Sequence, residues 1–272
     1  MNFFNGGALA DSVLEETKTL IGSKRLSLGI VSIGENEISQ RFITEKEKRG
    51  HELGVSVKHY SLASENSKAL RRRLAELVKK SEHDGWIVQL PLPRNVNAQY
   101  VLNSISEAED IDCLSQKSLG ALAAGRSKIL PPVVAAVKTL LGSQQINLVG
   151  KKIVILGAGR LVGRPVSLWL LSQNLPFAVL TEESKDMGQE LQKADVIISG
   201  VGKPGLIRGN MVSDGAVIID AGTAMDAGSL KGDADAESLK SKDGWLSPVP
   251  GGVGPLTIAH IFKNLVVLAS RS

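Results

Sequence analysis

Short apolar runs rich in β-branched residues alternate along the chain with longer segments in which apolar positions recur every three or four residues. The short runs predict strands, and the longer segments predict amphipathic helices. In the first third of the chain the predicted strands are 26–33, 55–62 and 86–90, and the predicted helices are 38–53 and 67–81. Because strands and helices alternate, we expect a parallel sheet with helices on its faces.

A second series of the same kind follows later in the chain. Its predicted strands are 153–156, 177–180, 196–199 and 216–220, and its predicted helix is 162–173. Residues 107–132 lie between the two series and show no clear period, so we place the domain boundary there. A last apolar helix is predicted over 256–268, after a glycine-rich loop, and we expect it to pack back on the first domain.

The first strand of the second series runs into a turn that carries Gly157, Gly159 and Gly163. This spacing is close to the fingerprint of dinucleotide-binding domains, where glycines let the backbone turn tightly and approach a pyrophosphate at a helix N-terminus. Pro165 suits the first turn of the helix that follows. A tight turn without a ligand needs similar glycines, but the position between a strand and a helix favours a Rossmann-like nucleotide-binding domain.

The choice of dinucleotide depends on the end of the next strand, which carries Glu182 and Glu183. An acid at about 20 residues beyond the glycines can hydrogen-bond the ribose 2′-hydroxyl of NAD, and it would repel the 2′-phosphate of NADP. Arg160 is the nearby cation that would favour NADP. A solvated loop explains the two acids about equally well, so the sequence favours NAD only slightly.

Candidate chemistry in the first domain centres on a lysine. Four residues spaced i, i+3, i+4 and i+7 share one face of the first predicted helix: Ser39, Phe42, Ile43 and Lys46. A lysine beside apolar side chains can be desolvated, which lowers its pKa and makes it a usable acid/base, although most lysines reach solvent. Gln89 lies at the end of the third predicted strand, where open α/β sheets bind ligands.

Composition excludes several classes of function. A single cysteine, Cys113, excludes an intrachain disulfide and a CxxC zinc site, and the four histidines are scattered, so no metal is expected. A net charge of +4 and an aromatic content of 4% do not indicate a nucleic-acid-binding surface. The chain shows no signal peptide and no apolar run long enough to span a bilayer, so a cytoplasmic location and no membrane partner are expected.

Five stretches of the chain resemble one enzyme family. They are residues 39–46, the VQLPLP block at 88–93, the glycine turn with VGRP at 162–165, VGKPG at 201–205 and PVPGGVGPLT at 248–257. Over nearly its whole length the chain is similar to the bifunctional methylenetetrahydrofolate dehydrogenase/methenyltetrahydrofolate cyclohydrolase family. The resemblance implies an α/β fold of two domains with a cleft between them. The N-terminal βαβ-type catalytic domain, which binds folate, would comprise 1–115 plus 255–272, and the Rossmann-like NAD(P)-binding domain 116–254.

The resemblance also implies a chemistry. A hydride would pass from 5,10-methylenetetrahydrofolate to the nicotinamide, and water would open the resulting 5,10-methenyl cation to 10-formyltetrahydrofolate. Lys46 matches the family's catalytic lysine, Gln89 the glutamine that positions it, and Asp112 the aspartate that holds the pterin. The implied substrate-binding residues are Ser39, Phe42, Val88, Leu90, Pro250, Gly251, Gly252, Val253 and Gly254. The implied cofactor-binding residues are Gly157, Ala158, Gly159, Arg160, Gly163, Glu182 and Thr223. A homodimer is implied as well.

Several positions depart from the family pattern. Phe42 replaces the motif tyrosine and keeps the ring without the hydroxyl. Cys113 replaces the glycine of a DVDG motif. The nucleotide turn lacks the family's usual arginine and serine at Ala158 and Gly159, and Glu182 replaces a serine. These last changes point away from NADP.

Four hypotheses follow. The first, which the presence of Lys46, Gln89 and Asp112 favours, is an active bifunctional enzyme that prefers NAD. The second is a member that retains one of the two activities, because the hydroxyl missing at Phe42 need not matter equally to both. The third is a non-catalytic folate- or nucleotide-binding protein. The fourth sets the resemblance aside and is a generic NAD-dependent hydroxy-acid dehydrogenase. Such an enzyme commonly needs a histidine acid/base near an acidic partner, and none of the four histidines has that setting in the sequence.

Overall fold

The computed structural model describes residues 1–226 and 228–270, and it divides the chain into two compact units. Unit 1 comprises residues 1–11, 122–125 and 133–257, and unit 2 comprises 12–121, 126–132 and the chain from 258 onward. Each unit has its own parallel sheet. Among the described residues, every helix is too short or too polar to span a lipid bilayer.

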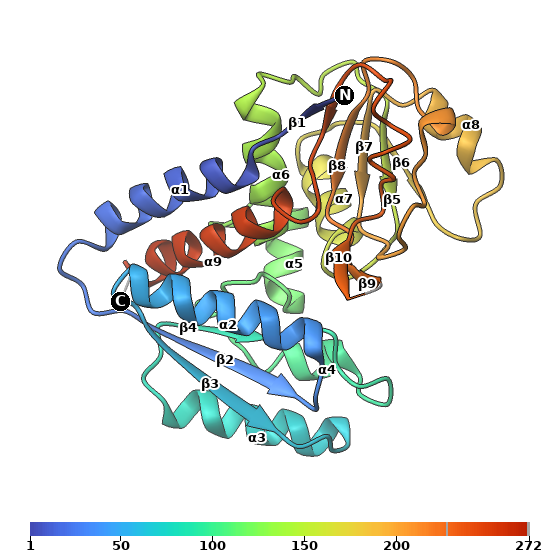
Figure 1. The fold of residues 1–272 in the computed structure, drawn as a ribbon. Coiled ribbons are helices and arrows are strands. Elements are labelled where there is room, and N and C mark those ends of the chain that lie inside the picture. Colours follow the sequence, from blue (N-terminus) through green and yellow to red (C-terminus); the bar gives the residue numbers. More distant parts are fainter. Residues whose placement is uncertain (227, 271–272) are drawn as a thin grey trace. The chain divides into compact units, whose positions relative to one another are not determined.

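The sheet of unit 2 has three parallel strands in the order β3-β2-β4. The strands are β2 (Ser27–Ile33), β3 (Ser56–Leu62) and β4 (Gly85–Val88). Figure 1 shows this sheet between helix α2 (Glu37–Glu52) and helix α3 (Ser67–Lys80). The predicted elements of the first series are therefore confirmed to within two residues at each end.

Both helices of this layer begin at an asparagine. The side-chain oxygen of Asn36 accepts the backbone N–H of Ser39 at 2.8 Å, and that of Asn66 accepts the N–H of Ala69 at 3.0 Å. Each cap satisfies one of the N–H groups that a helix start leaves without an intrahelical partner. The cap at Asn36 sets the start of α2 and thereby the face on which Ser39 and Lys46 lie.

Several helices of the fold were not predicted from the sequence, and two of them show why. Helix α1 (Gly6–Ile21) buries a series of residues spaced three or four apart, and this signal was present in the sequence: Ala10, Val13, Leu14, Thr17 and Ile21. Helix α5 (Gln116–Ala123) lies in the stretch 107–132 for which we expected no regular element. Its start is favoured by Ser115, whose hydroxyl oxygen accepts the N–H of Ser118 at 3.2 Å.

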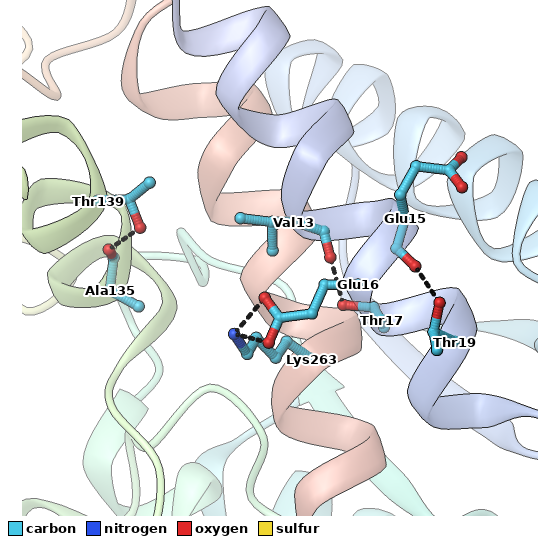
Figure 2. Close-up of polar contacts among 8 residues, drawn as sticks. All are labelled: Val13, Glu15, Glu16, Thr17, Thr19, Ala135, Thr139 and Lys263. Atoms are coloured by element: carbon cyan, nitrogen blue, oxygen red, sulfur yellow. Dashed lines mark hydrogen bonds and ion pairs between the residues drawn. The ribbon is translucent and has the colours of Figure 1, made fainter. Parts of the chain in front are cut away.

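Helix α9 (Val253–Ala269) agrees with the last predicted helix, and from Ile258 onward it belongs to unit 2. Figure 2 shows the ion pair between the Lys263 ammonium of α9 and the Glu16 carboxylate of α1, with both N–O distances at 2.9 Å. Because both side chains are partly exposed, such a pair contributes only about 0–1 kcal/mol. Short helix α4 (Ala98–Leu102) completes the regular structure of unit 2.

Unit 1 contains a six-stranded parallel sheet in the order β1-β11-β8-β7-β5-β6. The strands are β1 (Asn2–Phe3), β11 (Trp245–Leu246), β8 (Val217–Asp220), β7 (Val196–Ser199), β5 (Ile153–Leu156) and β6 (Phe177–Leu180). Its helices are α6 (Pro132–Ser143), α7 (Gly163–Ser172) and α8 (Met187–Gln192), with the 3-10 turn η1 (Gly209–Met211). A separate hairpin joins β9 (Ala224–Asp226) and β10 (Ser229–Lys231). The four predicted strands of the second series are present.

The observed units differ from the expected domain limits in three places: at the N-terminus, at 116–121 and 126–132, which belong to unit 2, and at 255–257, which belong to unit 1. Residues 1–11 belong to unit 1, whereas we expected them in the first domain. The reason is the pairing of β1 with β11, in which Asn2 is the partner of Trp245. Strands of two residues are too short to produce a hydrophobic period, so the sequence pattern could not indicate this pairing.

Candidate active site

Lys46 and Gln89 form a hydrogen-bonded pair in unit 2. Lys46 lies on α2 and is 5% exposed, and Gln89 follows the end of β4. The Lys46 Nζ donates to Gln89 Oε1 at 2.7 Å. The amide nitrogen of Gln89 donates in turn to the Leu90 carbonyl at 2.9 Å, which keeps the amide oxygen turned toward the lysine. The Ser39 hydroxyl donates to the same carbonyl at 3.3 Å.

The charge state of Lys46 depends on its surroundings. Burial lowers the pKa of Lys46, and the negative charge of Asp112 acts in the opposite direction. Burial also raises the pKa of Asp112 to about 6, while Lys46 lowers it and Asp110 raises it further. The structure therefore brings Lys46, Gln89 and Asp112 into one polar group in which burial shifts both ionisable side chains toward their neutral forms.

The turn that carries Asp112 is held by its neighbour Asp110, which is 3% exposed. The Asp110 carboxylate accepts the N–H groups of Leu114 and Ser115 at 3.2 and 2.7 Å, and the Ser118 hydroxyl at 2.7 Å. Three donors on one buried carboxylate fix the local backbone. Asp110 thus has a structural role, whereas Asp112 interacts electrostatically with Lys46.

The glycine turn of unit 1 lies between β5 and α7, as predicted. Gly157 has φ of 89°, a conformation that favours glycine, and its N–H donates to the Leu180 carbonyl of β6 at 2.8 Å. A Cβ added to Gly163 would lie 1.8 Å from the Gly157 carbonyl oxygen. The Val162 side chain does not cap the start of α7. The turn is therefore closely packed and brings backbone N–H groups to a helix N-terminus, which suits a pyrophosphate.

Three other cofactor candidates lie around this turn in unit 1. Glu182 is exposed and follows the end of β6, the strand whose last carbonyl bonds Gly157. Arg160 lies in the turn itself, and its pKa is lowered by burial and by the charge of Arg164. Thr223 follows β8, and its carbonyl oxygen would be 3.4 Å from a Cβ added to Gly202. The candidates for ribose, phosphate and nicotinamide contacts thus all lie at the carboxyl ends of the strands.

Comparison with known proteins identifies the family. The model of the tetrahydrofolate dehydrogenase/cyclohydrolase catalytic domain matches residues 4–112, and the model of the NAD(P)-binding domain of the same family matches residues 131–272. The chain belongs to the tetrahydrofolate dehydrogenase/cyclohydrolase family. Its NAD(P)-binding domain, its α/β two-domain fold and the enzyme class implied by the resemblance are thereby confirmed.

Individual relatives agree with this assignment. The bifunctional protein FolD of Moorella thermoacetica is 36% identical over 246 residues, which is 90% of this chain and 88% of the relative. The structure of FolD from Campylobacter jejuni has a TM-score of 0.92 at 33% identity and covers 99% of both chains. The FolD structure from Trypanosoma brucei, a complex with NADP and an inhibitor, has a TM-score of 0.91 at 27% identity and covers 99% of this chain and 97% of that one.

The remaining substrate candidates divide between the two units. Three of them are buried in unit 2: Ser39, Val88 and Leu90. Val88 and Leu90 flank Gln89 in the chain, and the Ser39 hydroxyl donates to the Leu90 carbonyl. Phe42 is half-buried one turn before Lys46. Residues 250–254 of the family's PGGVGP segment belong to unit 1. Their role beside the pterin and nicotinamide stays a prediction.

The family departure at Cys113 has a structural consequence. Cys113 has φ of 56°, in the left-handed region that glycine adopts without strain. A cysteine there costs on the order of 1 kcal/mol relative to glycine. Its thiol is buried, and burial with neighbouring carboxylates raises its pKa well above the usual value, so it is not activated as a nucleophile.

Sequence reasoning missed two buried carboxylates in unit 1. Asp220 is 2% exposed, and Asp233 is fully buried. Asp220 is the last residue of the strand β8, and its place at the carboxyl end of a parallel strand could have indicated a position near a ligand site. Asp233 lies in an irregular segment without a period, so the pattern did not single it out. Neither belongs to a metal site, since no group of three or more potential ligands occurs among the described residues.

Proposed function

We propose that this chain oxidises 5,10-methylenetetrahydrofolate to the 5,10-methenyl compound with NAD(P) and hydrolyses that compound to 10-formyltetrahydrofolate. The observation that carries the proposal is the Lys46–Gln89 hydrogen bond of 2.7 Å, in which the lysine is buried, with Asp112 close enough to shift the pKa of Lys46. The relatives named FolD are described as bifunctional, which agrees with two reactions at one site.

The two reactions place different demands on Lys46. When bound, an oxidised nicotinamide dinucleotide accepts the hydride. A positive charge then develops on the folate, and a neutral lysine destabilises that charge less than an ammonium does. Burial, which lowers the pKa of Lys46, favours this neutral form. In the hydrolysis the same amine can take a proton from attacking water, with the Gln89 amide oxygen holding the Nζ in place.

The direct test is spectrophotometric. Purified protein is assayed for methenyltetrahydrofolate formation with NAD and with NADP, and hydrolysis of the methenyl compound is followed separately without dinucleotide. We expect turnover in both reactions. No oxidation with either dinucleotide would remove the dehydrogenase proposal, and no hydrolysis would remove the cyclohydrolase proposal.

A second candidate function is a member with one surviving activity. The observation that favours it is Phe42, which lies on α2 one turn before Lys46 and has no hydroxyl to offer the site. The separate assays distinguish it from the first proposal. Comparable competence in both reactions would contradict it.

We further propose that Asp112 holds the pterin as a carboxylate. Because the pKa of Asp112 is raised to about 6, its charge is present above that pH and is lost as the pH falls through it. The KM for methylenetetrahydrofolate is therefore expected to rise by about tenfold per pH unit below this value. In the Asp112→Asn variant this side chain does not titrate, so its KM should be raised at every pH and should not rise further as the pH falls below about 6. The same pH-dependent rise of KM in the variant would contradict the assignment.

We propose that NAD is the preferred dinucleotide, because Glu182 follows the strand that bonds the glycine turn. Glu182→Gln removes the charge that would repel a 2′-phosphate and is expected to raise kcat/KM for NADP by about tenfold, with a small change for NAD. Glu183→Gln, the exposed neighbour, is the matched control. Steady-state kinetics with both dinucleotides measure the ratio. An unchanged ratio would show that Glu182 does not select the cofactor.

The resemblance also carries three coarser proposals. We propose that the first domain, predicted as 1–115 plus 255–272, binds folate and that 116–254 binds the dinucleotide. A homodimer and a cytoplasmic location are proposed on the same ground. Size-exclusion chromatography with light scattering tests the dimer, because a mass near 28.9 kDa would contradict it.

A further inference from the structure

The fully buried carboxylate of Asp233 lies beneath the loop that follows β7. Its Oδ2 accepts the Ser199 hydroxyl at 2.5 Å and the Val201 N–H at 2.8 Å, and its Oδ1 accepts the Lys203 N–H at 2.7 Å. All three contacts are donors, and a carboxylate accepts without donating. The backbone of the loop 200–203 is therefore hydrogen-bonded to Asp233 at both Val201 and Lys203.

The loop 200–203 packs directly on the glycine turn of the same unit. A Cβ added to Gly200 would lie 2.3 Å from the Cβ of Val162, and one added to Gly157 would lie 3.3 Å from the Val201 side chain and 3.4 Å from the Gly200 carbonyl oxygen. The backbones are thus in close contact without space between them. A displacement of the loop must move Gly157 or Val162 with it.

A second loop of the cofactor region meets the same carboxylate. A Cβ added to Gly222 would lie 2.3 Å from the Asp233 carboxylate atoms. The neighbouring carboxylate of Asp220 accepts the N–H groups of Gly222 and Ala234 at 2.9 and 2.8 Å. The loop before Thr223 is therefore held against Asp233 by packing and by hydrogen bonds to Asp220.

We propose that Asp233 is a positioning residue for the dinucleotide site: it holds the backbone of residues 200–203 in the shape that supports the glycine turn. The inference rests on the proposed dehydrogenase function and adds a residue that touches neither substrate nor cofactor. A carboxylate suits this task because three donors converge on it in a region without solvent, where each charge-assisted bond is strong. Preorganised N–H groups on the turn then need no rearrangement when a pyrophosphate binds.

The test is Asp233→Asn, which preserves shape and turns one acceptor into a donor. The new NH2 group must face the N–H of either Val201 or Lys203, so one end of the loop is released. We expect the dissociation constant for the dinucleotide, measured by calorimetric titration, to rise at least about tenfold. Hydrolysis of the methenyl compound without dinucleotide is expected to stay within about twofold, because Lys46 and Gln89 belong to unit 2.

Asp195→Asn is the matched control. Asp195 also accepts a backbone N–H in the same sheet, that of Lys152 at 2.7 Å, but before the first residues of β5 and β7 and not after their carboxyl ends. Its replacement should leave the dissociation constant unchanged. Thermal unfolding of both variants reports any general loss of stability.

The outcomes separate the inference from the proposed function. If the wild-type protein binds no dinucleotide, the dehydrogenase function fails. If it binds and Asp233→Asn binds equally well, or loses both activities in parallel with its thermal stability, the positioning role of Asp233 is wrong.

Ser199→Ala provides a second test should Asp233→Asn fail to fold. Ser199 is fully buried on β7, and its hydroxyl donates to the Asp233 carboxylate. We expect a rise of about threefold in the dissociation constant, since one of three bonds to the carboxylate is lost. An unchanged constant in this variant would overturn the inference.

Discussion

Lys46→Met is expected to lower the rate of methenyltetrahydrofolate hydrolysis by about 10²- to 10⁴-fold, the range that a positioned acid/base contributes. Methionine keeps the length and the apolar stem of the side chain but cannot donate to Gln89 or exchange a proton. Because Lys46 is 5% exposed, its replacement also removes a desolvation cost, so the melting temperature should not fall. The affinity for the substrate should change much less than the hydrolysis rate. The expected result is therefore a variant that binds the methenyl compound but hydrolyses it very slowly.

Lys48→Met is the matched control for this experiment. Lys48 lies two residues further on the same helix and is exposed, so its replacement changes the same residue type without touching the Gln89 amide. Its hydrolysis rate should equal that of the wild type within about twofold. A Lys46→Met variant with an unaffected cyclohydrolase rate would reject the acid/base role of Lys46.

Gly163→Ala is expected to lower dinucleotide-dependent oxidation by about 10²-fold while hydrolysis continues. The added Cβ would lie 1.8 Å from the Gly157 carbonyl oxygen and 3.1 Å from the Ala158 Cα, so the turn must open by about 1 Å or more. A displacement of that size in a binding backbone costs about 10²-fold in rate or affinity. The dissociation constant for the dinucleotide and the kcat/KM for oxidation measure the loss.

Gly142→Ala controls for the general effect of replacing a helical glycine in unit 1. Gly142 lies in α6, and a Cβ there would meet nothing within 4 Å. Alanine is expected to stabilise the helix by about 0.5–1 kcal/mol and to leave dinucleotide binding unchanged. Equal affinities in wild type and Gly163→Ala would show that the turn does not contact the dinucleotide.

Much of the fold could be predicted because its signals are local. The strands β2–β4 and β5–β8 are short apolar runs, and the helices α2, α3, α7 and α9 carry apolar positions at helical spacing. The glycine turn was also predictable, because its three glycines lie between a predicted strand and a predicted helix, which is the context that the dinucleotide fingerprint requires. Helix α1 carries the same kind of signal, in the buried residues spaced three or four apart from Ala10 to Ile21.

Elements without a local signal could not be predicted in this way. Strands β1 and β11 have two residues each, and their pairing joins Asn2 to Trp245 across nearly the whole chain. A hydrophobic period cannot be recognised in two residues. This pairing, with the ring contact between Phe4 and Trp245, places residues 1–11 in the unit with the larger sheet.

For the site, the sequence by itself determined which side chains share a face of α2 and that Gln89 lies at the carboxyl end of the third strand. It could not determine that Lys46 and Gln89, 43 positions apart, meet at 2.7 Å, because that distance depends on how the helix packs on the sheet. The family resemblance singled out Asp112, but the sequence could not show what environment distinguishes it from Asp110. In the fold, three donors bond the buried Asp110 carboxylate. Burial raises the pKa of Asp112, which interacts with Lys46, to about 6.

Asp233 is the clearest case of what only the tertiary structure decided. In the sequence it is one acid among several between residues 226 and 237. In the fold it is fully buried, and three donors from β7 and the loop after it converge on its carboxylate. Local patterns determine secondary structure because their physics acts between near neighbours. The environment of a buried charge is set by residues distant along the chain, and only their packing decides its role.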